Sequence, residues 1–231
     1  VIAIGHGRRV FGAQVRRMHV VEVQQHEYWR FAVLLANPVQ RHFKRFGVVA
    51  SENASLFFAI AGVVEAAAKA LKGADGEDII ILLSARLSTE TMYAVKRLAA
   101  QLKGAQIFGT GRPGWDDDKV LKSADRNPNS AGLALVFGDD LGSPEDLEQR
   151  LSSGTVKVAL ALDEKTTNPD ALADVGTVIS LAHRYAGVGK SASVVLPMAA
   201  WCEVDGSFVN KDGQVGRFHP AVDAPGDAQP G

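Results

Sequence analysis

The sequence predicts a doubly wound, mostly parallel α/β sheet with helices on both faces and a β-hairpin near the carboxyl end. Residues 78–83 (DIIILL) contain a continuous apolar run bounded by charge, which is typical of a strand buried on both faces of a parallel sheet, and residues 133–137 are interpreted as another buried strand. Segments with helical spacing of apolar residues lie between such runs, which is the order of β–α–β units. Turn residues at 210–213 separate two short alternating runs, and this pattern favours a hairpin.

The first part of the predicted domain contains one complete β–α–β unit. An alanine-rich segment at residues 57–71 precedes the unit and has the apolar spacing of a helix. After the strand at 78–83, Ser88 is typical of a helix N-cap, and we expect that helix to continue to about Lys103. Residues 106–109 are the next predicted strand, at a distance that suits a parallel crossover.

The rest of the domain continues the alternation of strands and helices. Residues 110–132 interrupt it as a long loop with a turn-forming cluster, of the kind that often carries binding functions. The remaining predicted elements are a strand at 133–137, a helix at 144–151, strands at 157–162, 177–181 and 193–196, and a short helix at 169–173.

Composition and charge exclude several classes of function. With 231 residues and an apolar fraction of 46%, the chain can bury a substantial core. Its formal net charge of −1 lacks the basic excess that binding to nucleic acid or to an anionic membrane surface requires. No apolar run reaches the roughly 18–20 residues that span a bilayer. We therefore expect no nucleic-acid partner and no direct membrane insertion.

The residues of metal-binding types do not have the spacing of a metal site. The single cysteine, Cys202, can form neither an intramolecular disulfide nor a thiolate-ligated cluster by itself, and a small core residue is the favoured interpretation. Three consecutive aspartates at 116–118 lack the alternate spacing of an EF-hand loop. They predict instead the first turn of a short helix that ends at Ser123. We expect no metal site and no catalytic residue in this chain.

The two ends of the sequence differ in how regular their patterns are. Residues 1–51 show no clean period and form an unassigned segment, in which His19 and His26 are interpreted as solvated or capping residues. Residues 52–231 form the predicted α/β domain. Because the chain begins with Val1 rather than Met, we expect a piece of a longer protein or an incomplete chain.

Two aspartates and a glycine-rich run are the binding candidates that the pattern itself supplies. Asp139 and Asp163 follow predicted strands, where parallel sheets bind ligands, although capping of the next helix is an equally supported role. Residues 187–191 (GVGKS) lack the spacing of a phosphate-binding P-loop. A glycine loop with a solvated Lys190 is therefore favoured.

The carboxyl-terminal sequence resembles the signature of the molybdopterin oxidoreductase superfamily. The matching positions are 191–197, Trp201, Glu203, Asp205, Gly206, 208–210, Gly213 and Arg217. Residues 83–90 (LSARLSTE), 118–132 and 226–230 (GDAQP) are further similar to the large G subunit of NADH:quinone oxidoreductase, the respiratory complex I. The resemblance covers about residues 52–231.

This resemblance implies a scaffold α/β domain in the electron-transfer arm of such a complex, one that has lost the pterin cofactor of the superfamily. It implies iron–sulfur clusters only on cysteine motifs outside this chain, and therefore no self-contained active site here. The implied partners are other subunits of the peripheral arm. The implied location is cytoplasmic, at the inner face of a bacterial membrane through those partners.

The same superfamily implies an alternative, a fragment of a catalytic oxidoreductase that binds a molybdopterin guanine dinucleotide at strand-end loops. The candidate cofactor-binding residues are Ser84, Asp139, Asp163, His183 and Lys190. Residues 183–187 depart from the superfamily sequence, which weakens the expectation of a pterin contact in that loop. No position matches the cysteine, selenocysteine or serine that holds the metal in catalytic members.

Overall fold

The computed structural model of the protein describes residues 52–118, 120–164, 168–225 and 228, and side chains from residue 62 onward. The unassigned segment 1–51, with His19 and His26, lies outside these residues. The chain divides into two compact units, Val1–Ile60 and Ala61–Gly231. The second unit contains the sheet and the candidate site.

A six-stranded sheet forms the centre of this unit, and all of its paired strands are parallel. Its strands are β1 (Ile79–Ser84), β2 (Gln106–Thr110), β3 (Leu141–Gly142), β4 (Val158–Leu162), β5 (Thr177–Ala182) and β6 (Val194–Pro197). Their order in the sheet is β3-β2-β1-β4-β5-β6. The chain therefore moves outward from β1 in one direction and resumes on its other side with β4, which confirms the predicted doubly wound fold.

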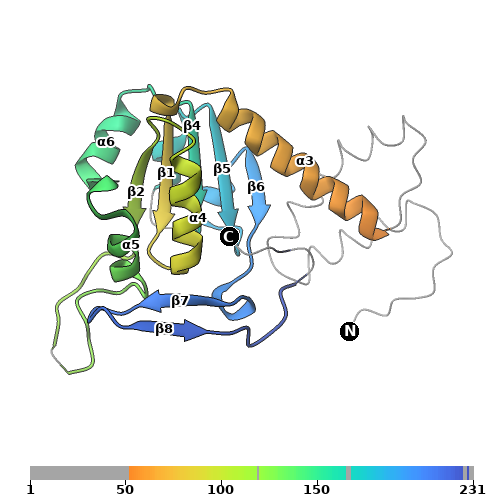
Figure 1. Ribbon diagram of the computed structural model, residues 1–231. Helices are drawn as coiled ribbons and strands as arrows, with labels where there is room; N and C mark the ends of the chain where they lie inside the picture. Colours follow the sequence, from red (N-terminus) through yellow and green to blue (C-terminus); the bar gives the residue numbers. More distant parts are fainter. Residues whose placement is uncertain (1–51, 119, 165–167, 226–227, 229–231) are drawn as a thin grey trace, which may run out of the picture. The chain divides into compact units, whose positions relative to one another are not determined.

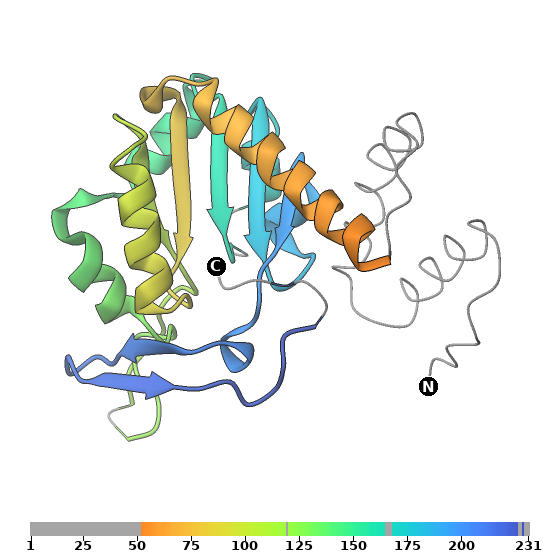
Figure 2. The same ribbon diagram turned by 45° about the vertical axis from the view of Figure 1, so that its right-hand side comes forward.

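Helices cover both faces of the sheet (Figures 1 and 2). The α-helices are α3 (Glu52–Lys72), α4 (Thr89–Ala99), α5 (Ser130–Phe137) and α6 (Pro144–Ser152). Short 3₁₀ turns occur at η1 (Gly76–Asp78), η2 (Gly138–Asp140), η3 (Pro169–Leu172), η4 (Gly187–Lys190) and η5 (Trp201–Glu203). No helix in the described part of the chain is both long and apolar enough to cross a membrane.

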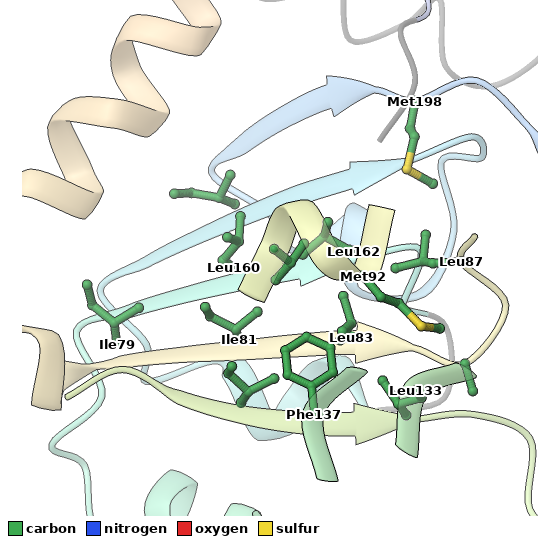
Figure 3. Packing of buried hydrophobic residues seen from close by; sticks show 14 of the residues in the cluster. Ile79, Ile81, Leu83, Leu87, Met92, Leu133, Phe137, Leu160, Leu162 and Met198 are labelled. Atoms are coloured by element: carbon green, nitrogen blue, oxygen red, sulfur yellow. The ribbon is translucent and has the colours of Figure 1, made fainter. Parts of the chain in front are cut away.

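The unbroken apolar run of β1 is explained by burial on both faces. Ile79, Ile81 and Leu83 point to one face, where they pack with side chains of α4, α5 and the later part of α3 (Figure 3). Ile80 and Leu82 point to the opposite face and pack with side chains of α6, η3 and η4. Each of these five side chains is fully buried, which contributes about 1.5–3 kcal/mol per residue by removal of apolar surface from water.

Local capping signals fix the starts of two helices as predicted. The Ser88 side chain accepts a hydrogen bond from Thr91 N at the start of α4. Ser143 forms a reciprocal capping box with Asp146 at the start of α6. The α4 helix ends at Ala99, before the predicted Lys103, because the chain continues as tight turns toward Gly104.

Two predicted elements are wrong. Residues 133–137 belong to helix α5 rather than to a strand, with Leu133 and Phe137 buried one turn apart and Leu135 70% exposed. A five-residue apolar run has no period of its own, so it does not distinguish a strand from a helix. The described residues of 116–123 form no helix. The Asp118 carboxylate instead accepts hydrogen bonds from the backbone N–H groups of residues 120–122, which fold into a turn.

The predicted hairpin is confirmed as β7 (Gly206–Val209) and β8 (Val215–Phe218), a separate antiparallel pair. Asn210 N donates to Gln214 O at 2.9 Å, and Gly213 has a positive φ of 78° in the turn. The centroids of the Phe208 and Phe218 rings lie 4.6 Å apart. In Figures 1 and 2 the hairpin runs across the carboxyl ends of the sheet strands.

Candidate functional site

Asp163 lies directly after β4, beside the point where the order of the sheet reverses. It is 3% exposed and is the one non-glycine residue with positive φ, 48°, in the described part of the chain. Its backbone N–H donates to Leu181 O at 2.7 Å, which holds this conformation against β5. Aspartate tolerates the left-handed region better than most residues because its short side chain makes local polar contacts.

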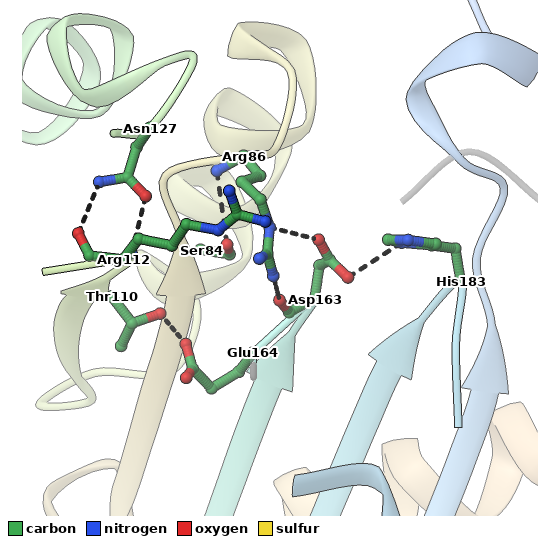
Figure 4. A network of polar contacts seen from close by, with 8 residues as sticks. All are labelled: Ser84, Arg86, Thr110, Arg112, Asn127, Asp163, Glu164 and His183. Atoms are coloured by element: carbon green, nitrogen blue, oxygen red, sulfur yellow. Dashed lines mark hydrogen bonds and ion pairs between the residues drawn. The ribbon is translucent and has the colours of Figure 1, made fainter. Parts of the chain in front are cut away.

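The Asp163 carboxylate joins residues that follow the two neighbouring strands (Figure 4). Arg86 Nε donates to Asp163 Oδ2 at 3.2 Å, and Arg86 Nη2 donates to the Asp163 carbonyl oxygen at 2.6 Å. On the other side, His183 Nδ1 lies 3.0 Å from Asp163 Oδ1. A buried carboxylate is tolerated when it is paired and hydrogen-bonded, and Arg86 meets this requirement at Oδ2. The contact of Oδ1 with His183 is an ion-pair distance rather than a well-aligned hydrogen bond.

A second polar contact lies beside the first at the same edge of the sheet. The Thr110 hydroxyl, at the end of β2, donates to the carboxylate of Glu164, which is 2% exposed. Ser84 Oγ accepts a hydrogen bond from Arg86 N at 3.4 Å. The carboxyl ends of β1, β2, β4 and β5 are therefore linked by side chains that bond to one another (Figure 4).

A cavity of about 260 Å³ opens beside this network. Its basic lining residues are Arg86, Arg112, His183 and Arg184, and Asp163 is its acidic one. On the side of the hairpin, Met198, Trp201 and Phe218 complete the wall. Guanidinium groups that line a cavity suit an anion such as a phosphate, because they donate several hydrogen bonds in a fixed fork.

The cavity is partly open to solvent rather than enclosed. Pockets that enclose a drug-sized ligand usually measure about 300–1,000 Å³, and this one, at about 260 Å³, lies just below that range. It holds a group of the size of one phosphate or one ring, and the rest of a larger ligand would extend through its open side.

The structure brings together three of the five residues proposed from the sequence. Ser84, Asp163 and His183 meet at the carboxyl ends of the strands. Asp139 lies in η2 after helix α5, because the strand expected before it is a helix, and it lines a different cavity of about 610 Å³ with Gln106 at the start of β2. Lys190 is the last residue of η4 and lines neither cavity.

The sequence alone did not identify Arg86 and Arg112, which give this edge of the sheet its positive charge. Arg86 is the main partner of Asp163, although 77 residues separate them. Arg112 was placed in a loop without a role, and its backbone is held by two hydrogen bonds to the Asn127 side chain. The one indication in the sequence is the position of these residues, because polar residues that follow neighbouring parallel strands lie together at one edge of the sheet.

Within the described residues, no cluster of three or more histidine, cysteine, aspartate or glutamate side chains is arranged to hold a metal ion. Cys202 is half-buried in η5. The site therefore offers charge complementarity and hydrogen-bond donors to an anion.

The carboxyl-terminal part of the chain is similar in sequence to a known family. Residues 147–231 match the family model of molybdopterin oxidoreductase. This confirms the resemblance seen in the sequence. The molybdopterin oxidoreductase match includes Asp163, His183, Lys190 and the hairpin, whereas Arg86 and Arg112 precede it.

Individual relatives extend the likeness upstream of the matched region. The chain is 26% identical to the NADH-quinone oxidoreductase G subunit of Salmonella typhimurium in an alignment 196 residues long, which covers 74% of this chain and 20% of that protein. The corresponding protein of Escherichia coli strain K12 has the same identity and coverage. A shorter segment of 41 residues is 58% identical to the alpha subunit of F420-dependent formate dehydrogenase 2 of Methanococcus maripaludis, covering 18% of this chain and 6% of that protein. The chain spans about one fifth of the length of its NADH-quinone oxidoreductase relatives.

Proposed function

We propose that this chain is part of the G subunit of an NADH-quinone oxidoreductase and serves there as a cofactor-free scaffold domain. The similarity to that protein over 74% of the chain supports the assignment to such a complex. In this proposal the domain positions neighbouring subunits of the peripheral arm of complex I, at the inner face of the membrane. Electron transfer from NADH toward quinone takes place on other parts of the complex.

One observation carries the scaffold role: the polar groups at the carboxyl ends of the strands bond to one another. Asp163 is engaged by both Arg86 and His183, and Glu164 by Thr110. In a doubly wound sheet this edge is where ligands bind, so mutual pairing there favours a structural role.

A second candidate function is binding of a molybdopterin guanine dinucleotide by a catalytic relative. Arg112 and Arg184 favour it, because both line the cavity and could bind the phosphates of such a cofactor. The similarity to a formate dehydrogenase alpha subunit points in the same direction, over a short segment. In that case Ser84, Asp163, His183 and Lys190 are proposed to contact the cofactor.

A measurement of cofactor content distinguishes the scaffold role from cofactor binding. The full-length protein that contains this segment is purified without oxygen, and its molybdenum, tungsten and pterin contents are measured. The scaffold proposal expects none of the three while NADH-quinone oxidoreductase subunits co-purify. Stoichiometric pterin with molybdenum or tungsten would establish the second candidate.

A matched pair of variants checks that result. Under the second candidate, replacing Arg112 and Arg184 together with alanine should lower the pterin content. The change Arg97→Ala should not, because Arg97 lies on α4 and does not line the cavity. Under the scaffold proposal both variants keep the subunit composition of the wild-type complex.

A further inference from the structure

The β7–β8 hairpin and the turn η5 that precedes it are tied to each other at several points. Cys202 O, in η5, accepts a hydrogen bond from Ala221 N at 2.8 Å, which joins the chain that enters the hairpin to the chain that leaves it. His219 Nδ1 lies 2.6 Å from Asp205 Oδ1 and adds a second contact between these two parts. Residues 200–222 therefore form one internally bonded unit, the flap.

Aromatic rings strengthen the flap from within. The centroid of the Phe218 ring lies 4.6 Å from that of Phe208 and 6.4 Å from that of Trp201, which it meets edge to face. A two-stranded hairpin alone is at best marginally stable in water. The ring contacts and the bonds to η5 are therefore what let the flap keep its shape.

Three side chains, at the start of α4 and just before α5, hold the flap to the rest of the domain. Ser207 donates to the Glu90 carboxylate from its backbone N–H at 2.9 Å and from its hydroxyl at 2.8 Å. Thr89 Oγ1 donates to Ser207 O at 3.0 Å. Val209 N donates to Asn129 Oδ1 at 2.7 Å. These contacts fall on two residues of β7 and form a narrow clasp.

The sheet and the apolar core do not share in this attachment. Within the described residues, no backbone–backbone hydrogen bond joins the flap to the rest of the domain. The described members of the two apolar clusters beside the sheet include no flap residue, although Val209 is buried. An attraction between Lys211 in the hairpin turn and Asp117 is exposed to water, which screens it. The clasp is therefore the main attachment of the flap.

The chain can bend where it enters and leaves the flap. Met198 N donates to Ala182 O at 3.1 Å, which fastens the chain to the end of β5. Two residues later, Ala200 N bonds within the flap, to Glu203 Oε2 at 2.8 Å. Beyond the flap, residues 223–225 have no regular secondary structure. Rotation at these two places would break the clasp and leave the internal bonds of the flap intact.

The flap forms one side of the cavity beside Asp163. Trp201, Val204 and Phe218 line the cavity from the flap, whereas Arg86 and Asp163 line it from the strand ends. Figures 1 and 2 show the hairpin across the carboxyl ends of the strands. Displacement of the flap would remove this apolar side of the wall and expose the strand ends to water.

We propose that the flap opens as one body away from the carboxyl ends of the strands and thereby controls access to the cavity beside Asp163. Openings of this kind require less free energy than global unfolding, because few apolar contacts are lost. The flap works in the same way whether the domain is a scaffold or binds a cofactor, because the same contacts close the cavity in both.

Hydrogen exchange resolved to single amides in the full-length protein distinguishes movement of the flap from its unfolding. The amides of Ser207 and Val209 bond to the clasp, and they should exchange at least about tenfold faster than the amides of β1 and β4. The amides of Asn210 and Ala221 bond within the flap. They should exchange more slowly than the clasp amides, because opening as one body leaves their bonds intact.

The change Glu90→Ala weakens the clasp at a residue that does not line the cavity. Exchange of the Val209 amide should then rise about 10–100-fold, as expected for loss of hydrogen bonds to a charged acceptor. Glu145→Ala is the matched control, because Glu145 occupies the first turn of α6 as Glu90 does that of α4, and it is exposed. It should leave the Val209 rate unchanged. Unchanged exchange in β1 and β4 shows that both variants are folded.

Arginine labelling measures access to the cavity itself. Phenylglyoxal modifies accessible guanidinium groups, and the Arg86 side chain is 20% exposed while the flap is closed. Peptide mass spectrometry should show faster labelling of Arg86 in Glu90→Ala than in the wild type. Arg97, which is exposed on α4 and does not line the cavity, is the internal reference and should be labelled at the same rate in both.

Each other outcome contradicts a specific part of the inference. If Ser207 and Val209 exchange as slowly as the central strands, the flap stays closed and the inference is wrong. If Asn210 and Ala221 exchange as fast as the clasp amides, the hairpin unfolds instead of moving as one body. If Glu90→Ala speeds exchange at Val209 but leaves the labelling of Arg86 unchanged, the flap does not control access to the cavity.

Discussion

At the scale of single residues, Asp163 connects the three central strand ends. Its carboxylate is 5% exposed, and the side chains of Arg86 and His183 that bond to it are 20% and 25% exposed. Both partners thus retain some contact with water, which moderates the cost of removing the carboxylate. The main-chain position of Asp163, with its positive φ, is a separate constraint that asparagine would satisfy.

The change Asp163→Asn therefore removes the charge while keeping the backbone. We expect the free energy of unfolding to fall by about 2–3 kcal/mol, somewhat below the range for a fully buried ion pair. Chemical denaturation of the purified protein measures this loss. Asp139→Asn is the control, and an exposed substitution of this type should change stability by less than about 0.5 kcal/mol. Equal effects of the two changes would contradict a structural role for the network.

Asn129 is a second residue whose contacts reach beyond its own element. It is fully buried, its Nδ2 donates to Leu87 O at 2.8 Å, and its Oδ1 accepts from Val209 N. A Cβ on Gly132 would lie only 2.1 Å from Asn129 Oδ1, so this glycine leaves the space that the side chain occupies. One amide thus joins the loop before α4 to the hairpin.

We predict that Asn129→Ala leaves two buried backbone groups without partners and lowers the free energy of unfolding by about 1–3 kcal/mol. Hydrogen exchange should show faster loss of protection at Val209 than in the strands of the sheet. Asn168→Ala, which removes an exposed cap from η3, is the matched control and should leave the hairpin unchanged. A slow Val209 amide in Asn129→Ala would contradict the assignment.

At the scale of elements, the Glu90 carboxylate and the Thr89 hydroxyl of α4 hold the hairpin through hydrogen bonds with Ser207. Partial burial of Glu90 opposes its ionisation, but hydrogen bonds from the Ser207 side chain and backbone outweigh that effect and lower its pKa below the ordinary value of 4.5. The stabilisation is therefore complete above about pH 4.5, and it is lost as the pH falls through the lower pKa of the folded protein.

Below pH 4.5, the free energy of unfolding of Glu90→Gln should depend less on pH than that of the wild type. The difference in the free energy of unfolding between the two proteins should be largest above pH 4.5. Denaturant unfolding at a series of pH values measures the difference between variant and wild type. Glu145→Gln, an exposed glutamate on α6, serves as the comparison. If the free energy of unfolding changes with acid pH in the same way in the wild type and in Glu90→Gln, the stabilising role of the Glu90 carboxylate is refuted.

Elements with strong local signals could be predicted from the sequence, and those set by tertiary context could not. Ser88 and Ser143 cap helices through contacts three residues away, and the apolar run of β1 can be stable only where both faces are covered. The run at 133–137 lacked a period, so its helical state follows from packing of Leu133 and Phe137. The Arg86–Asp163 pair depends on strand order, which spacing along the chain does not encode.

At the scale of the whole molecule, residues 191–217 close one side of the sheet and cover its carboxyl edge. They supply β6, which pairs with β5, most of the hairpin, and the cavity-lining residues Met198 and Trp201. Their loss would expose the apolar edge of β5 and the buried network around Asp163.

We predict that deletion of residues 191–217 prevents this domain from folding. Solubility and circular dichroism melting of the deletion protein provide the measurement. Replacing only Lys211 and Asp212 of the hairpin turn with alanine is the control, because both side chains are exposed and pair with each other. A soluble deletion protein that melts cooperatively would contradict the prediction.

The order of the sheet also determines when its centre can form during synthesis. β1 is paired on one side with β4, and the paired residues Ile79 and Val158 lie about 80 residues apart in the sequence. At the ribosomal rate of about 5–20 residues per second, β1 would wait roughly 4–16 s for this neighbour. During that interval one edge of the most apolar strand in the sheet stays open, so nascent chains are expected to be most prone to aggregation, and most dependent on chaperones, before β4 emerges.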